Sequence, residues 1–364
     1  MASTGGERPW TWRAADAEDF PVQARLFNAC FGKTKDTDTF RWKYELNPHG
    51  PAVSRVALNT DGDVVGGYSY VPRWFRRDGK RLLLMQASDA MVDPSARRQR
   101  IFTGLDDIVC EAVGADGVPW VYAYSGRLSY QGFLRNGWQD IGQALVYRYR
   151  FKSARGLARM GRVAKVAGLA SGLLDAQYAR RDRRLARYDQ DVAAVTRVTR
   201  FGPECDELFE ATLPAVGLVG ERDHAWLNWR YIDNPGRRQE CWMLPAEGGG
   251  APLGWLVAEF QGGNAFLVDH LARDDEVRAR LLAAFTSMAH ARGMHEATAL
   301  LFRHHPAVPL LTDLGYAPPR RSKLFRDSFP WIVRACCEDA DDADLSIDRW
   351  HLADGDRDAE HMSP

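Results

Sequence analysis

A polar turn dense in arginine stands directly before a stretch with helical periodicity. Arg97, Arg98, Gln99 and Arg100 form the turn, and apolar residues recur from Ile101 at the 3.6-residue period of a helix. The first N–H groups of a helix have no helical partner, and the helix dipole gives that end partial positive charge. Guanidinium groups beside it would add charge-assisted bonds to phosphate. The stretch therefore predicts an anion site, with a solvated helix start as the alternative.

A strand is expected before this turn, ending at Pro94, and the helix is expected to end near Gly114. Together they resemble the pyrophosphate loop of the GNAT acyl-CoA N-acyltransferases, in which a strand ending in Val-x-Pro leads into Arg-x-x-Gly-x-Gly/Phe. Val92, Pro94 and Arg97 match, whereas Arg100 stands where the family usually has glycine, which permits close backbone approach. The resemblance implies acetyl-CoA or another acyl-CoA as acyl donor, without a metal. The residues that it implies for binding this cofactor are Met91, Val92, Arg97, Arg98, Gln99, Arg100, Ile101, Phe102 and Phe133.

The segment 125–142 resembles the family's next element, a helix that ends in a Gly-aromatic pair. Phe133 occupies the position at which many members carry the tyrosine that protonates the departing thiolate. In this chain the proton must come from another group. Tyr130 and Ser129 are the nearest candidates, with water as the alternative.

Acyl transfer to an amine needs a group that takes a proton from the nitrogen and a polarised thioester carbonyl. Asp89 lies three residues before Val92 on the expected central strand, where the superfamily often has its carboxylate. The alternative is a structural hydrogen-bonding role, because Asp269 holds the corresponding place downstream. Backbone N–H groups near Met91 and Val92 would polarise the carbonyl. The predicted catalytic residues are therefore Asp89 and Tyr130.

The elements that must position these groups occur twice in the chain. Asp89 aligns with Asp269, and this pair lies between two other matches, Gly66 with Gly254 and Gly137-Trp138 with Gly315-Tyr316. The matches follow the same order in both copies, which indicates a duplicated domain. The aromatic residues of the matched segments are either core and turn residues or a wall for the acceptor. The closest match aligns Trp42, Lys43, Tyr44, Asn47 and Pro48 with Trp229, Arg230, Tyr231, Asn234 and Pro235.

The 364 residues suit two domains of about 150–200 residues. We predict an α/β (mixed α+β) fold of two tandem GNAT-like domains, each a twisted mixed sheet flanked by helices. This arrangement resembles the two-domain branch that includes amino-sugar N-acyltransferases. The predicted parts are an N-terminal GNAT domain with the acyl-CoA site (1–150), a basic helical linker (151–194), a degenerate C-terminal GNAT domain (195–335) and an acidic, disordered tail (336–364).

The two copies differ at the start of their long helices. In the second copy the acidic residues Asp274, Asp275 and Glu276 precede the helix. Acidic side chains cap a helix N-terminus and compete with phosphate for the same N–H groups. We therefore place the acyl-CoA in the first copy and expect a structural or acceptor-binding role for the second. The apolar stripe of the linker either packs on the domains or lies on an anionic membrane or nucleic acid.

Composition excludes several classes of function. The 48 basic and 48 acidic residues give a formal net charge of zero, so no overall field attracts nucleic acid or a membrane. The N-terminus lacks the apolar core of a signal segment, and no apolar run approaches the roughly 20 residues of a membrane span. The six cysteines lack metal-ligand spacing. We expect a soluble, cytoplasmic protein without stable membrane insertion, nucleic acid or metal; a homodimer is compatible with the sequence.

These observations lead to one main hypothesis of function and two alternatives. The first is a CoA-dependent N-acyltransferase that moves an acetyl or short acyl group to a small-molecule amine, with a nucleotide-linked amino sugar as the favoured acceptor. The second is a tandem GNAT transferase of thiol or peptidoglycan-type metabolism. The third is a catalytically inactive tandem GNAT module that binds a metabolite or partner. The acceptor rests on family analogy, because one fold hosts many substrates.

Overall fold

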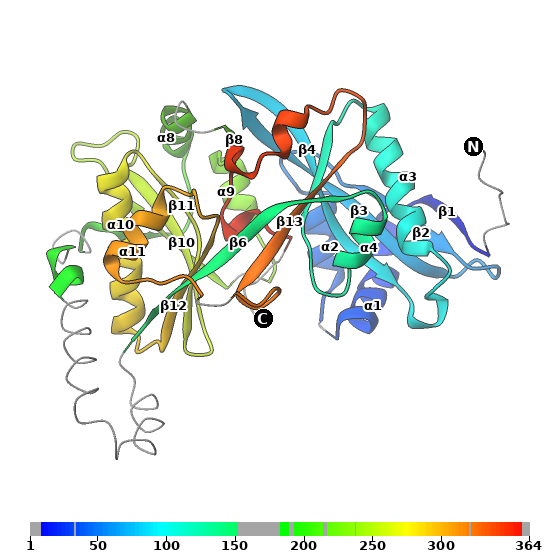
Figure 1. The fold of residues 1–364 in the computed structure, drawn as a ribbon, viewed down its shortest axis with the longest axis horizontal. Helices are drawn as coiled ribbons and strands as arrows, with labels where there is room; N and C mark the ends of the chain where they lie inside the picture. Colours follow the sequence, from blue (N-terminus) through cyan, green and yellow to red (C-terminus); the bar gives the residue numbers. More distant parts are fainter. Residues whose placement is uncertain are drawn as a thin grey trace, which may run out of the picture.

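The computed structural model describes residues 9–32, 34–151, 183–188, 193–213, 217–236, 238–319 and 322–358. Within these residues, 14 strands belong to one mixed sheet with the order β1-β2-β3-β4-β5-β13-β6-β12-β11-β10-β9-β7, while β8 pairs with β3 and β14. Helices flank the sheet in both halves (Figure 1). The predicted mixed α/β fold is therefore confirmed. Most of the linker predicted at 151–194 lies outside the described residues.

The bounds of the elements follow the chain from one half to the other. The strands are β1 (Thr11–Ala14), β2 (Val53–Leu58), β3 (Val64–Arg77), β4 (Lys80–Val92), β5 (Trp120–Tyr124), β6 (Gln139–Arg150), β7 (Thr196–Val198), β8 (Leu218–Gly220), β9 (Gln239–Leu244), β10 (Gly254–Gln261), β11 (Asn264–Ala272), β12 (Glu296–Leu301), β13 (Ser328–Ala335) and β14 (Trp350–His351). The α-helices are α1 (Phe20–Phe31), α2 (Thr37–Tyr44), α3 (Ile101–Ala115), α4 (Tyr130–Arg135), α8 (Glu204–Thr212), α9 (His224–Tyr231), α10 (Asp275–Ala291) and α11 (Ala307–Leu314).

The long helix of each half covers the sheet with an apolar face. In α3 the side chains of Ile101, Leu105, Val109 and Val113 are at most 2% exposed, which confirms the helix predicted from their spacing. In α10, Leu281, Leu282 and Phe285 are fully buried against β10 and β11. Burying each such side chain contributes about 1.5–3 kcal/mol, so these two faces fix the helices on the sheet.

The halves exchange their last strands. β13, which ends the second half, lies between β5 and β6, and β6, which ends the first half, pairs with β12 from Glu296 opposite Arg150 to Leu301 opposite Leu145. Figure 1 shows β6 and β13 running side by side between the two halves. The sheet is therefore continuous, and neither half completes its own part of it.

The two segments that align in the sequence meet at the centre of the molecule. Trp42 and Trp229 stack with ring centroids 4.7 Å apart, and each indole Nε1 donates a hydrogen bond to the other residue's carbonyl oxygen, at 2.8 and 2.9 Å. Both helices that carry them begin with an aspartate cap, Asp36 in α2 and Asp223 in α9. These tryptophans are therefore core residues, one of the two alternatives that the sequence left open.

The C-terminal segment is folded as far as residue 358, so the prediction of a disordered tail is wrong for residues 336–358. Trp350 is fully buried against Phe75 and Trp331, and β14 pairs with β8. A 3₁₀ turn over Asp354–Asp356 is also buried. The acidic composition suggested disorder, but a single large aromatic side chain and ion pairs across the molecule anchor the segment. Figure 1 shows this red segment lying over the middle of the molecule.

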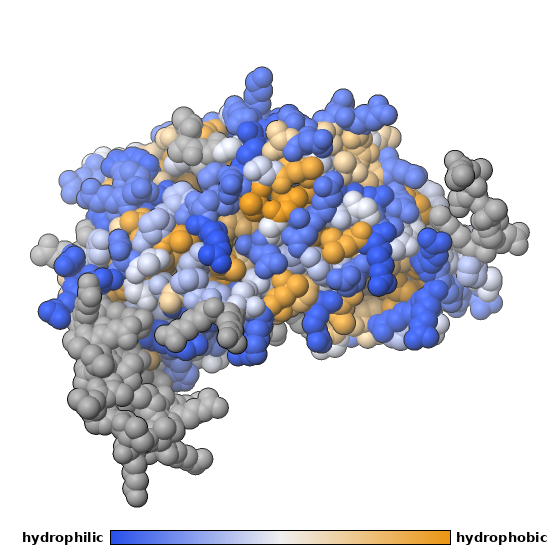
Figure 2. Space-filling view, in the orientation of Figure 1, coloured by the Kyte–Doolittle hydropathy of each residue, from blue (hydrophilic) through white to orange (hydrophobic). Residues whose placement is uncertain are grey.

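The surface agrees with the composition. Figure 2 shows hydrophilic side chains over most of the visible face, with apolar residues in separate patches between them. Among the residues that the structure describes, no helix combines the length and the apolar character that a membrane crossing requires.

Candidate active site

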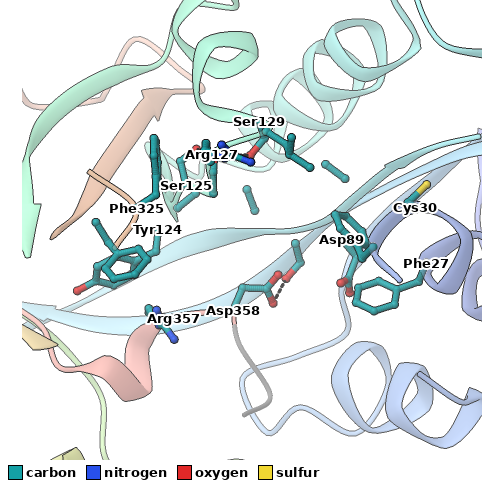
Figure 3. A pocket seen from close by; sticks show the side chains of 18 of the residues that line it. Phe27, Cys30, Asp89, Tyr124, Ser125, Arg127, Ser129, Phe325, Arg357 and Asp358 are labelled. Atoms are coloured by element: carbon teal, nitrogen blue, oxygen red, sulfur yellow. Dashed lines mark hydrogen bonds between the residues drawn. The ribbon is translucent and has the colours of Figure 1, made fainter. Parts of the chain in front are cut away.

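A cavity of about 1210 Å³ opens between the two halves, beside the ends of β4 and β5. Its lining comes from α1, β4, β5, α3 and α4 of the first half, from β11 and β12 of the second half, and from the C-terminal segment. Figure 3 shows Phe27, Cys30 and Asp89 on one side of it and Ser125, Arg127 and Ser129 on another. Arg357 and Asp358 lie on a third side, at the bottom of this view. A space of this size accommodates more than one small molecule.

The cavity exists because β4 and β5 separate. The two parallel strands pair only at Met85 with Val121 and at Gln86 with Tyr122. Beyond this point β4 is irregular opposite β3, and Asp89 has a φ of +48°, a left-handed conformation that is uncommon outside glycine. The bend carries the end of β4 away from β5, which opens a V-shaped gap between the strands.

The arginine turn has the backbone of an anion loop. Arg98 and Arg100 have φ values of +67° and +61°, so Arg100 adopts the left-handed conformation that a glycine would supply at this place. Arg100 is the N-cap residue of α3 and its side chain makes no capping hydrogen bond. Arg97 lines the cavity, while Arg98, Gln99 and Arg100 are exposed outside it. The start of α3 therefore presents N–H groups and guanidinium groups near the cavity mouth.

The start of α10 differs, as the sequence predicts. Asp274 accepts a hydrogen bond of 2.9 Å from the backbone N–H of Val277, and this bond lowers the pKa of its carboxyl group. Asp275 and Glu276 add negative charge in the first turn. An anion at this end would displace a carboxylate from the same N–H groups, so the two helix starts are not equivalent.

Asp89 lies in the cavity wall but is held by three groups. Its carboxylate accepts from Lys35 Nζ at 2.7 Å, from Lys43 Nζ at 3.1 Å and from Tyr44 Oη at 2.8 Å. In the second half, Asp269 accepts from Tyr231 Oη at 2.8 Å and from Arg222 Nε at 3.0 Å. Each aspartate thus accepts a hydrogen bond from the tyrosine at the matching position, Tyr44 or Tyr231. Because this contact occurs in both halves, it favours the structural role for Asp89.

Tyr130 points away from the cavity. Its Oη donates to Asp140 Oδ2 at 2.5 Å, and its pKa is raised to about 12 by partial burial and by that carboxylate. Tyr130 is not among the cavity residues, so its hydroxyl has no access to a bound thioester there. Phe133 does line the cavity, with its ring 5.1 Å from that of Phe102.

The structure brings together five of the predicted residues and separates the others. The cavity wall contains Asp89, Val92, Arg97, Phe102 and Phe133. The side chains of Met91 and Ile101 are buried in the core. Residues outside the cavity are Met91, Arg98, Gln99, Arg100, Ile101 and Tyr130.

Tyr124, at the end of β5, is a cavity residue that the sequence reasoning missed. Its Oη is buried and has no hydrogen-bond partner among the residues that the structure describes. Burial raises the pKa of this phenol well above its usual value, so it stays protonated at neutral pH. The signal in the sequence was the aromatic end of the strand before Ser125, but only the separation of β4 and β5 places this side chain in the cavity wall.

The C-terminal segment also contributes to the wall, with Asp354, Arg357 and Asp358. Asp354 Oδ1 lies 2.5 Å from Arg357 Nε. Burial raises the pKa of Asp354 to about 6, although the positive charge of Arg357 acts to lower it. Asp358 accepts a hydrogen bond from Ser88 Oγ at 2.5 Å and pairs with Lys43. The only sign in the sequence of this contribution was the acidic, aromatic ending of the chain. No local pattern in that ending indicates that it packs against the cavity.

Among the residues that the structure describes, one group of side chains has the composition of a metal site. His49, Glu221 and Asp223 bring possible ligand atoms within 4.8 Å of one another. His49 Nδ1 accepts from the backbone N–H of Trp74, which places the imidazole proton on Nε2, and Glu221 pairs with Arg76 and Arg81. A nitrogen that carries a proton is not a metal ligand, so these contacts do not fit a bound cation.

Comparison with known proteins agrees with this geometry. Residues 11–140 match the family model described as an acetyltransferase (GNAT) domain. A search of the curated proteins found no match. Residues 11–140 contain the arginine turn, α3 and both strands that border the cavity.

Several solved structures are similar over most of the chain. A GCN5-related N-acetyltransferase from Anabaena variabilis has a TM-score of 0.60 at 13% identity, and a conserved protein from Enterococcus faecalis named as a probable N-acyltransferase has 0.61 at 11%. A GCN5-related N-acetyltransferase from Kribbella flavida has 0.59 at 14%. The alignments cover 90% of this chain in each case and 73%, 73% and 72% of the other chains. These likenesses establish the GNAT fold.

Proposed function

We propose that the protein is an N-acyltransferase that takes an acetyl or short acyl group from acyl-CoA and transfers it to the amine of a small molecule. The observation that carries the proposal is the start of α3. There, an arginine turn with left-handed backbone and no side-chain cap adjoins a large cavity, within the residues that match the acetyltransferase model. We propose further that the two halves are copies of one domain and that the second copy has lost the donor site.

The donor would bind along the first half. Its pyrophosphate would accept hydrogen bonds from the first N–H groups of α3 and from the guanidinium of Arg97. Its thioester arm would enter the gap between β4 and β5, past the aromatic rings of Phe102 and Phe133. Backbone N–H groups near Met91 and Val92 would then polarise the thioester carbonyl.

Tyr124 is the group we propose to protonate the leaving thiolate. In the overall reaction the acceptor starts as an ammonium ion and its nitrogen loses two protons, of which one leaves to solvent before the attack and the other ends on the CoA sulfur. Tyr124 would donate to the sulfur as the C–S bond breaks and would regain a proton from the nitrogen of the new amide. Its buried Oη and raised pKa keep it protonated until then.

The acceptor would lie between the halves. Tyr124, Phe325 and Phe329 supply aromatic faces there, and Asn264, Glu296 and Arg148 supply polar groups. Aromatic faces suit the apolar side of a sugar ring, and the cavity is large enough for a nucleotide beside it. A nucleotide-linked amino sugar therefore remains the favoured acceptor.

Replacing Arg97 and Arg98 together with alanine is expected to weaken acetyl-CoA binding at least tenfold. Each charge-assisted hydrogen bond to phosphate contributes about 1.5–3 kcal/mol, although exposure of Arg98 reduces its share. Titration calorimetry with acetyl-CoA and longer acyl-CoAs measures the change. Arg273→Ala at the start of α10 is the matched control and should bind normally. Equal affinity of all three proteins would place the donor elsewhere and contradict the assignment.

Replacing Tyr124 with phenylalanine is expected to lower kcat about 100-fold while leaving the Kd for acetyl-CoA unchanged, because a general acid acts only during the reaction. The assay follows CoA release with a panel of amines that includes glucosamine and a nucleotide-linked amino sugar. Tyr130→Phe is the control, and its kcat should stay within twofold of the original. A large loss of kcat in Tyr130→Phe with little change in Tyr124→Phe would assign the general acid to Tyr130 instead. Acetyl-CoA binding without turnover of any amine would instead favour the inactive binding module.

A further inference from the structure

The C-terminal segment places one carboxylate where an acceptor must approach. Four aspartates lie in the cavity wall, namely Asp36, Asp89, Asp354 and Asp358. Asp36 caps the start of α2, where its Oδ1 accepts hydrogen bonds from the N–H and the hydroxyl of Thr39. The side chains of Asp89 and Asp354 are only 3% and 2% exposed, whereas that of Asp358 is 27% exposed. A ligand in the cavity can therefore reach Asp358, while the carboxylates of Asp89 and Asp354 are covered by protein.

The position of Asp358 is fixed relative to the gap between the strands. Its Oδ1 accepts a hydrogen bond from Ser88 Oγ at 2.5 Å. β4 and β5 are in register at Gln86 and Tyr122, and two residues later on each strand come Ser88 and Tyr124, on the same face because side chains alternate. Asp358 at one arm of the gap and Tyr124 at the other thus flank the point where a thioester would lie. Figure 3 shows Asp358 beside the strand, between Arg357 and Asp89.

The neighbouring contacts orient Asp358 and balance its charge. Lys43 pairs with both Asp358 and Asp89, and Lys35 pairs with Asp89, so two ammonium groups face two carboxylates. Arg357, the adjacent residue, pairs with Asp354 instead. The backbone is held as well, because Gln86 Nε2 donates to the carbonyl of Asp356 at 2.6 Å and Arg230 Nη2 donates to that of Arg357 at 2.9 Å.

We propose that Asp358 binds the protonated amine of the acceptor, so that the last described turn of the chain completes an acceptor site that lies between the two halves. The inference rests on the proposed N-acyltransferase function and names its acceptor class: a primary amine that arrives as an ammonium ion. A carboxylate forms a strong, charge-assisted hydrogen bond with such a group. Ser88 and Lys43 are positioning residues, since they act on the acceptor through Asp358.

Replacing Asp358 with asparagine is expected to raise the KM for the amine by about 10–100-fold, the range for loss of a charge-assisted hydrogen bond, with the Kd for acetyl-CoA unchanged. The probes are glucosamine, lysine and spermidine, tested by CoA release and by calorimetry with the protein saturated with CoA. Glucose, which lacks the ammonium group, is the neutral competitor and should bind both proteins equally. Asp348→Asn is the matched control, because this tail carboxylate is 79% exposed at the surface.

A second variant moves the segment without altering its carboxylates. In Gly355→Ala the new Cβ would lie 1.9 Å from Tyr231 Oη, so the turn that carries Asp358 must shift. We expect the same rise in KM, with acetyl-CoA binding as the check that the first half is folded. An unchanged KM in both variants would overturn the assignment of Asp358, and so would calorimetry in which no amine binds.

The outcomes separate this inference from the proposed function. Amine binding that depends on Asp358 in a protein that does not bind acetyl-CoA would support the amine site and reject the acyl donor. Acetyl-CoA binding with amine affinity that is equal in the original protein and in Asp358→Asn would support the donor site and reject Asp358.

Discussion

Replacing Asp356 with asparagine is expected to lower the free energy of unfolding by about 3–5 kcal/mol, the usual effect of removing one partner from a buried ion pair. Asp356 joins one arginine from each half. Its Oδ2 lies 2.6 Å from Arg222 and its Oδ1 lies 3.3 Å from Arg73, and all three side chains are at most 5% exposed. Asparagine has nearly the same shape but no charge, so the Arg73 guanidinium would stay buried without its counterion, and Arg222 would keep only Asp269 as an acidic partner among the described residues.

Urea denaturation at neutral pH measures this change. Asp348→Asn is again the control, because Asp348 is exposed and should alter the stability by less than about 0.5 kcal/mol. A loss below about 1 kcal/mol for Asp356→Asn would mean that water replaces the carboxylate between the arginines. In that case Asp356 would not be what anchors the C-terminal segment.

Lowering the pH from 7 to 5 is expected to destabilise the protein by several kcal/mol. Burial lowers the pKa of His49 to about 2 and that of His270 to about 3, and both side chains are less than 9% exposed. Because the folded values lie below the unfolded value of about 6.5, the stability these residues provide is present above pH 6.5 and is lost as the pH falls toward 3. At pH 5 the two together cost on the order of 4 kcal/mol.

Other groups modify this dependence in known directions. Burial also lowers the pKa of His305 and of His351, the latter to about 4, which adds to the loss. Asp354 acts in the opposite direction, because its raised pKa of about 6 favours the folded state as it becomes protonated. Urea denaturation at several pH values checks the sum, and His270→Leu should flatten the curve between pH 7 and 5. A stability that is constant over this range would show that the histidines are solvated in the folded protein.

The parts of the structure that the sequence predicted depend on local patterns. The apolar spacing from Ile101 determines α3 directly, and the turn before it needs only its own residues and Asp93, which accepts from the N–H of Ser95. The matched segments around Trp42 and Trp229 are enough to predict that the two segments are equivalent, although not that the two rings stack on each other.

The parts that were missed depend on contacts between distant residues. Composition alone indicated disorder for the C-terminal segment, because Asp356 finds Arg73 only across 283 positions of sequence. Tyr130 was chosen for its nearness to Phe133, but its hydroxyl turns to Asp140. Tyr124 becomes a candidate only when the separation of β4 and β5 is known. Tertiary pairing of charges and the direction of a side chain leave no periodic trace in a sequence.

The exchange of β6 and β13 has a consequence for how the chain is made. Until β13 has left the ribosome, β5 lacks its neighbour and keeps an edge of unpaired N–H and C=O groups, and β6 awaits β12 from the other half. Domains usually fold in order during synthesis, but here the first half cannot close its sheet before almost the whole chain is present. Such distant pairings slow folding, and the exposed edge is open to aggregation in the meantime. A truncated first half is for the same reason a poor substitute for the complete protein.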